Sequence, residues 1–350
     1  MLWKQEVCRN GFGLNSPGRS SKETDVHLSY ISRLVCLALF SSGMLQIVFE
    51  TAAWALSPVL TSIDSDHARL REKVLFRLTL FVRTAPYLVV LFFLLPAYVR
   101  GEDNLAAERV GVICIGFAVA VLLRFLSGLV NLLRAMRKTG SYYSECHEVG
   151  RTAEGVPILL HPGNQSLLAV AGLFSSRILI SSGLFDRSRF SEMAFDVALA
   201  HEGAHARHRD NLKASLLSIL PHISIGSGRL PSLERQWRRA AELAADEEGA
   251  QGKPERSLLL AELLVALASE NHRPMPHILT TLLSRGEDLR ARVDRLLCRA
   301  EGNTLAKANL LRERLPTAFA IAAQAGVLAI LAYSCSRLGH EAAEFILKLG

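Results

Sequence analysis

Residues 195–212 read FDVALAHEGAHARHRDNL and contain the motif His-Glu-Gly-Ala-His at positions 201–205. On an α-helix, side chains four residues apart lie on one face, so His201 and His205 point the same way. Two neutral imidazoles placed like this supply half of a tetrahedral zinc site. Glu202 is not a ligand in this arrangement, but it lies beside the open metal position, where it can take a proton from bound water. The motif therefore predicts a zinc peptidase.

A chance occurrence of the motif is the alternative, since the chain contains 11 His in 350 residues. The surrounding residues argue against chance, because Ala194, Val197 and Ala198 predict a buried helix. Two imidazoles and a carboxylate in apolar surroundings cost free energy unless something coordinates them. The sequence therefore favours a metal site over an ordinary helix.

A third protein ligand is needed, because such a zinc site leaves only the fourth position to water. The best candidate is Glu242, which lies in an alanine-rich helix predicted over residues 233–249. Asp246, one turn later on the same face, can accept the other N–H of a ligand histidine and fix its tautomer. The alternative is that this helix is simply charged and solvated. His208 is a weaker third ligand, because it follows His205 by three residues and the metzincin pattern needs six.

Long apolar runs near both ends of the chain predict a membrane protein with a soluble insert. The chain is 50% hydrophobic, and each run is close to the roughly 20 residues that cross a bilayer. The net charge of +7 does not indicate nucleic acid, since Lys and Arg cluster beside the apolar runs and no DNA-binding motif occurs. Four spans are predicted, at residues 30–48, 78–99, 110–133 and 315–333.

The distribution of charge predicts which side of the membrane the site faces. Basic residues lie between the first two spans and again after the third, at Arg134, Arg137 and Lys138, whereas residues 100–109 are slightly acidic. The positive-inside rule therefore places the site in the cytoplasm, although the basic N-terminal tail departs from the rule. None of the six cysteines forms C-x-x-C, which agrees with a reducing compartment.

The insert between the third and fourth spans is predicted to be mainly helical with a small sheet. Short apolar stretches separated by glycine and proline predict an antiparallel sheet at residues 157–160, 167–170 and 177–180. Ser188 or Ser191 is expected to cap the motif helix, which is expected to end before Pro221. Further helices are predicted at residues 233–249, 258–268 and 284–299.

The predicted fold class is therefore an α+β membrane protein. Four transmembrane helices carry a mainly helical, gluzincin-like zincin domain with a small antiparallel sheet, inserted between the third and fourth spans. The predicted division of the chain is a polar tail at 1–27, a three-span membrane domain at 28–135, a zinc metallopeptidase domain at 136–312, a fourth transmembrane helix at 313–335 and a short tail at 336–350.

The segment SSGLFDRSRFSEMAFDVALAHEGAHARHRDNL, followed by RRAAELAAD, resembles the membrane zinc peptidases typified by the BlaR/MecR beta-lactam sensor-transducers, metallopeptidase family 56. The shared features are a serine-glycine turn, H-E-x-x-H with trailing Arg, Asp and Asn, and then E-x-x-x-D. The later LRARVDRLL resembles a segment that those proteins carry before their last span. The resemblance covers roughly residues 28–335, and its specific part lies at 175–250.

The resemblance implies that His201, His205 and Glu242 hold one Zn²⁺ ion per chain, that Glu202 is the general base and acid, and that Asp246 orients a ligand. It also implies a multi-pass protein of the bacterial cytoplasmic membrane that cleaves a cytoplasmic protein, such as a transcriptional repressor, or itself. The sensor-transducers continue into an extracellular penicillin-binding domain, whereas this chain stops at residue 350. Beta-lactam sensing is therefore not expected.

Two other functions stay open. A heat-shock or prenyl-processing membrane peptidase of broad specificity uses the same H-E-x-x-H and E-x-x-x-D residues, but it typically has further helices soon after the site. A non-proteolytic membrane signal transducer would keep the zinc fold for stability alone. The expected partners are the lipid bilayer and a protein or peptide substrate, without direct contact to nucleic acid.

Overall fold

The computed structural model describes eight stretches of the chain. The predicted fourth span at 313–335 and the tails at 1–27 and 336–350 lie outside the described residues. The described stretches are residues 29–62, 68–101, 110–163, 167–185, 191–220, 233–270, 280–281 and 286–301.

Three helices of the described chain are long and apolar enough to cross a membrane, which confirms the first three predicted spans at this level. Helix α1 covers Tyr30–Ser62 and α4 covers Val112–Ser144. The second is continuous from Ala68 to Arg100. It consists of α2 (Ala68–Val89), a π-helical turn η1 (Val90–Leu94) and α3 (Leu95–Gly101).

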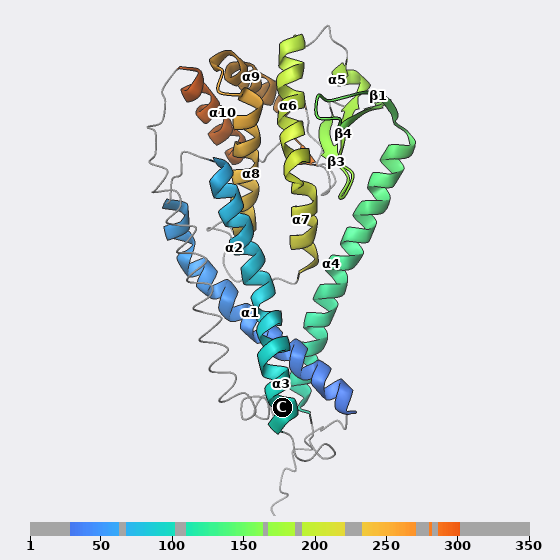
Figure 1. Ribbon diagram of the computed structural model, residues 1–350, viewed down its shortest axis with the longest axis vertical. Coiled ribbons are helices and arrows are strands. Elements are labelled where there is room, and N and C mark those ends of the chain that lie inside the picture. Colours follow the sequence, from blue (N-terminus) through green and yellow to red (C-terminus); the bar gives the residue numbers. More distant parts are fainter. Residues whose placement is uncertain are drawn as a thin grey trace, which may run out of the picture.

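Two of these helices extend beyond their apolar parts. Helix α2 begins at Ala68, so the basic residues Arg69, Arg71 and Lys73, expected between two spans, are helical. This end of α2 packs along α8 (Leu233–Ala250), as Figure 1 shows. Helix α4 likewise runs on to the edge of the sheet. Membrane-length helices therefore reach directly into the part of the molecule that bears the motif.

The sheet is mixed rather than antiparallel, which corrects the prediction. Strands β3 and β4 form an antiparallel hairpin, but β2 pairs with the other side of β4 and runs parallel to it. The strand order is β1-β2-β4-β3-β5. The strands are β1 (His147–Arg151), β2 (Pro157–His161), β3 (Leu168–Ala171), β4 (Arg177–Ser181) and the two-residue β5 (Thr280–Thr281).

The motif helix α6 begins where the sequence predicts and ends at His208, before Pro221. Of the two predicted caps, Ser191 is the N-cap, and its hydroxyl accepts a hydrogen bond from the Ala194 amide. The helix does not continue towards Pro221, because Arg209 adopts a left-handed conformation with φ 53° and ψ 42°. The remaining helices are α5 (Ser182–Phe185), α6 (Glu192–His208), α7 (Asp210–Ile219), α9 (Pro254–Glu270) and α10 (Gly286–Ala300).

The apolar core has one part around the sheet and another around α2. Helices α6, α9 and α10 pack with side chains of β2, β3 and β4. Side chains of α1, α2, α7 and α8 form a separate cluster around Trp237. Helix α4 instead exposes many large apolar residues, including Leu123 and Phe125, as expected for a helix that faces lipid.

Candidate metal centre

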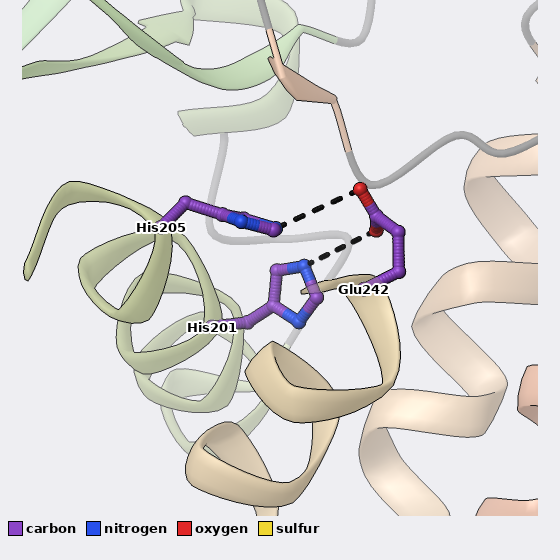
Figure 2. Close-up of side chains that lie close together, drawn as sticks. All are labelled: His201, His205 and Glu242. Atoms are coloured by element: carbon purple, nitrogen blue, oxygen red, sulfur yellow. Dashed lines mark ion pairs between the residues drawn. The ribbon is translucent and has the colours of Figure 1, made fainter. Parts of the chain in front are cut away.

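Three potential metal ligands meet between α6 and α8. Figure 2 shows the rings of His201 and His205 turned towards the carboxylate of Glu242. His201 Nε2 lies 3.9 Å from Glu242 Oε2, and His205 Nε2 lies 3.8 Å from Glu242 Oε1. The three ligand atoms all lie within 4.8 Å of one another. Ligands of a tetrahedral zinc ion, at bond lengths of about 2.0–2.2 Å, lie about 3.3–3.5 Å apart, so the group is close to a binding geometry.

The burial of the two histidines supports a metal at this place. His201 is 0% exposed and His205 is 2% exposed. Among the described residues, neither Nε2 atom has a hydrogen-bond partner. A buried polar nitrogen without a partner costs free energy, and a metal ion removes that cost. Two imidazole nitrogens and one carboxylate form a donor set that suits zinc, so the residues fit the ion that the sequence predicts.

Small residues on α8 bring the two helices close enough to form this group. Ala241, Ala244 and Ala245 are buried. A Cβ atom added to Gly249 would lie 3.3 Å from the Cβ atom of His201, which is a tight contact. The small side chains of α8 therefore let Glu242 approach the face of α6 that carries the two histidines.

A carboxylate lies against the second nitrogen of each ligand histidine. His201 Nδ1 is 3.0 Å from Asp246 Oδ1, and His205 Nδ1 is 2.8 Å from Asp210 Oδ2. Such carboxylates fix the tautomer and the ring orientation of a ligand, so that Nε2 is left for the metal. Asp246, which the sequence predicts to orient a ligand, therefore lies beside His201.

Asp210 was not among the predicted site residues. The left-handed turn at Arg209 ends α6 and directs Asp210 back towards His205. A helix continuing to residue 220 would instead carry Asp210 away from that ring. The sequence signal that could have found it is the trailing Asp in the H-E-x-x-H segment.

Arg292 on α10 was also missed, and it contacts Glu242 and Asp246 of α8. Its side chain is 1% exposed. Nε and Nη2 donate to the two oxygens of Asp246 at 2.7 and 2.6 Å, while Nη1 lies 2.9 Å from Glu242 Oε2. Burial alone would raise the pKa of Asp246, but Arg292 and His201 outweigh it and hold that pKa well below its ordinary range. Asp246 therefore stays ionised beside His201.

The predicted general base, Glu202, is fully buried next to this group. Burial raises its pKa to about 8, the charge of His205 opposes this, and the charge of Glu242 adds to it. The backbone of Val170 on β3 is near enough to lower this pKa, but among the described residues neither oxygen of Glu202 has a hydrogen-bond partner. Asn211 Nδ2 donates to the carbonyl oxygen of Val170 at 2.8 Å and so holds β3 against α7.

The electrostatic surroundings act differently on the two histidines. Burial alone lowers the pKa of a histidine, and it lowers the pKa of His201. At His205, however, the negative charges of Glu242 and Asp210 outweigh burial and raise the pKa to about 9. The same negative charge attracts a metal cation.

His208, the weaker ligand candidate, lies outside the group. Its Nε2 is 2.5 Å from Glu248 Oε1, and its Nδ1 is 2.5 Å from Arg69 Nη2. His208 therefore links α6 to α8 and α2.

Comparison with known proteins adds no family to this picture. No protein-family model matches the sequence, and no curated protein is significantly similar to it. The molecule itself presents three membrane-length apolar helices and a buried His-His-Glu group that fits an H-E-x-x-H…E zincin-like site.

Proposed function

We propose that this protein is an integral-membrane zinc endopeptidase of the BlaR/MecR type, which cleaves a cytoplasmic regulatory protein, itself, or both. The observation that carries the proposal is the buried group of His201, His205 and Glu242, with Nε2 of both histidines turned towards the glutamate. Glu202, buried directly after the first ligand, supplies the proton-transfer group that peptide hydrolysis needs.

The residues of the site divide the chemistry between them. When bound by His201, His205 and Glu242, zinc supplies activation of a water molecule and polarisation of the peptide carbonyl. Glu202 takes the proton from that water on its carboxylate and later gives it to the leaving amine. Burial raises the pKa of Glu202, which favours the step in which it gives the proton to the leaving amine.

The outer edge of β3 is the best place for an extended substrate. It already pairs antiparallel with the short strand β5, with Val170 opposite Thr280 and Ala169 opposite Thr281. This edge therefore pairs with an extended segment through main-chain hydrogen bonds, and a substrate would take the place of β5 there. Because the backbone of Val170 is near enough to influence the pKa of Glu202, a peptide on this edge would lie near the proton-transfer group.

The site is proposed to face the cytoplasm of a bacterial cell, from the charge distribution around the spans. A cytoplasmic repressor, or a loop of the protein itself, is then within reach. Cleavage of many unrelated membrane proteins would instead favour the heat-shock type of peptidase.

The decisive experiment compares wild type with Glu202→Gln in native membranes. Tagged termini and a proteome-wide search for new fragments report cleavage, and zinc content is measured on both purified proteins. Glu262→Gln, an exposed glutamate on α9, is the matched control. We expect fragments in wild type and in the control, and none in Glu202→Gln, with zinc retained in all three.

The identities of the fragments then separate a dedicated regulator from a quality-control enzyme. If no fragment depends on Glu202 although all three proteins hold zinc, the peptidase proposal is wrong and the non-proteolytic transducer is favoured.

A further inference from the structure

The membrane-length helix α2 carries a fully buried carboxylate, Glu72. A buried charge costs free energy unless opposite charges and hydrogen-bond donors surround it. Three donors surround the carboxylate of Glu72. Arg69 Nη1 lies 2.7 Å from Oε2, and Lys213 Nζ and Trp237 Nε1 lie 2.8 and 2.9 Å from Oε1. Since Lys213 belongs to α7 and Trp237 to α8, Glu72 joins α2 to two helices of the metal-binding part.

A chain of charged contacts continues from Glu72 to a metal ligand. Lys213 Nζ also lies 2.9 Å from Asp210 Oδ1, and Asp210 Oδ2 lies 2.8 Å from His205 Nδ1. The side chains are 0%, 18%, 4% and 2% exposed in the order Glu72, Lys213, Asp210 and His205. Water therefore screens these contacts little, and each charge acts strongly on the next.

The ammonium group of Lys213 is shared between the carboxylates of Glu72 and Asp210. Because Asp210 also contacts His205, Glu72 acts on His205 through Lys213 and Asp210. Without the charge of Glu72, Lys213 keeps Asp210 as its carboxylate partner and is drawn towards it. Lys213 then competes with His205 for the oxygens of Asp210. Because Asp210 sets the ring orientation of His205, the geometry of the ligand changes as well.

We propose that Glu72 is a positioning residue for His205, and that α2 thereby sets the affinity of the group for a metal ion. The inference rests on the metal site of the proposed function, but not on peptidase activity. A displacement of α2 relative to α7 and α8 reaches the ligand through Lys213 and Asp210. The second membrane-length helix is thus coupled to the metal centre.

An ion pair elsewhere between α2 and α8 provides a matched control. Arg83, on α2 and 4% exposed, places Nη2 2.6 Å from Glu234 Oε2 on α8 and donates to the carbonyl oxygen of Leu217 on α7. Within the described part of the chain, no hydrogen bond or ion pair joins Arg83 or Glu234 to the metal-binding residues or their carboxylate partners. Glu234→Gln therefore weakens the same helix contact and leaves the chain to His205 intact.

The test measures metal affinity on the full chain in detergent micelles. Zn²⁺ affinity is obtained by competition with a chromophoric chelator, and the absorption spectrum of bound Co²⁺ reports ligand geometry. We expect Glu72→Gln to lower Zn²⁺ affinity by about 10-fold or more and to change the Co²⁺ spectrum. Glu234→Gln should change the affinity by less than about 2-fold, even if both variants unfold at a similarly reduced temperature.

A double-mutant cycle tests whether Lys213 passes the effect on. Lys213→Met should lower the affinity, and adding Glu72→Gln to it should lower the affinity no further. Equal affinities for Glu72→Gln and Glu234→Gln would overturn the proposal, and so would additive effects of the Glu72 and Lys213 substitutions.

Two further outcomes remain decisive. If Glu72→Gln does not fold, Lys213→Gln is measured in its place. In that variant Glu72 keeps its contacts to Arg69 and Trp237. Unchanged Zn²⁺ affinity in Lys213→Gln overturns the proposal. If wild type binds no stoichiometric zinc, the proposed metal site fails and this inference fails with it. Stoichiometric zinc in wild type without any effect at Glu72 contradicts only the inference.

Discussion

Arg292 Nη1 lies 2.9 Å from Glu242 Oε2, so a helix well separated in sequence holds the third member of the metal group. The same guanidinium binds both oxygens of Asp246, which in turn lies against His201. One arginine therefore positions two of the three ligands, Glu242 directly and His201 through Asp246. Arg292 contacts Oε2 of Glu242 and makes no such contact with Oε1.

Arg292→Met should damage both stability and metal binding. Removing one partner of a buried ion pair leaves uncompensated charge and costs about 3–5 kcal/mol. Loss of a residue that orients ligands lowers metal affinity by about 10–100-fold. Thermal unfolding and chelator competition measure the two effects. Arg292→Lys should be intermediate, because an ammonium group cannot reproduce the planar fork that binds both carboxylates.

Arg299→Met is the control for Arg292. It removes another ion pair between α10 and α8, in which Arg299 Nη2 lies 2.6 Å from Glu247 Oε1. We expect a stability loss of at most about 1 kcal/mol, since this pair is partly solvated, and unchanged metal affinity. Equal loss of affinity in both variants would show that α10 acts only through packing.

Removal of the metal should destabilise the wild-type protein. A ligand that binds only the folded state adds about 4 kcal/mol of stability when its free concentration is 1,000 times its dissociation constant. A strong chelator should therefore lower the unfolding temperature, and added Zn²⁺ should restore it. His205→Ala should respond to neither treatment. An unfolding temperature that ignores the chelator in wild type would contradict a metal at this group.

A side chain at Gly128 should separate α4 from α7. A Cβ atom there would lie 2.7 Å from the backbone oxygen of Ser218 and 3.0 Å from that of Ile219. Backbone atoms cannot turn aside as a side chain can, so Gly128→Val should cost about 1–3 kcal/mol. Gly116→Val, on the same helix, has no atom within 4 Å of its Cβ position and should be nearly neutral. Unfolding temperatures of the two variants in detergent compare them directly.

The ion pairs of Glu248 should make stability depend on pH in the acid range. Burial would raise the pKa of Glu248, but hydrogen bonds from His208 and Arg207 outweigh it and lower the pKa from 4.5 to about 2. A pKa that is lower in the folded state stabilises the protein above the ordinary value, and this stability is lost as pH falls towards about 2.

The measurement for Glu248 is thermal unfolding of the metal-free protein between about pH 6 and about pH 3. Glu248→Gln should be less stable than wild type by on the order of 1 kcal/mol at the upper end, and the difference should shrink as the pH falls. A constant difference across the range would show that these pairs do not depend on the ionisation of Glu248.

Local periodicity explains what could be predicted from sequence. The shared face of His201 and His205 follows from the helical repeat alone, and the E-x-x-x-D spacing places Glu242 and Asp246 on one face of the alanine-rich helix. The apolar runs likewise predict the three membrane-length helices. Strand order is not local, so the sequence could not show that β2 would pair parallel with β4.

The missed residues depend on tertiary contacts or on an uncommon backbone conformation. Arg292 is one of several arginines in an amphipathic helix, and only packing of α10 on α8 shows that it is the buried one. Asp210 reaches His205 because the backbone of Arg209 is in the left-handed region. Non-glycine residues rarely adopt this conformation, so the sequence did not predict it. Glu72 lies in a basic run that the sequence suggests is a loop between spans, whereas the structure makes it part of α2.

The cluster around Trp237 shows that two membrane-length helices also cover the part of the molecule that bears the motif. Phe49 of α1 and Leu75 of α2 cover Trp237 and Leu217, which belong to the motif-bearing part. Expressing residues 136–312 alone would strip this cover and expose aromatic surface to water. We therefore expect such a fragment to precipitate, so that the motif-bearing part would lose its solubility when it is separated from α1 and α2.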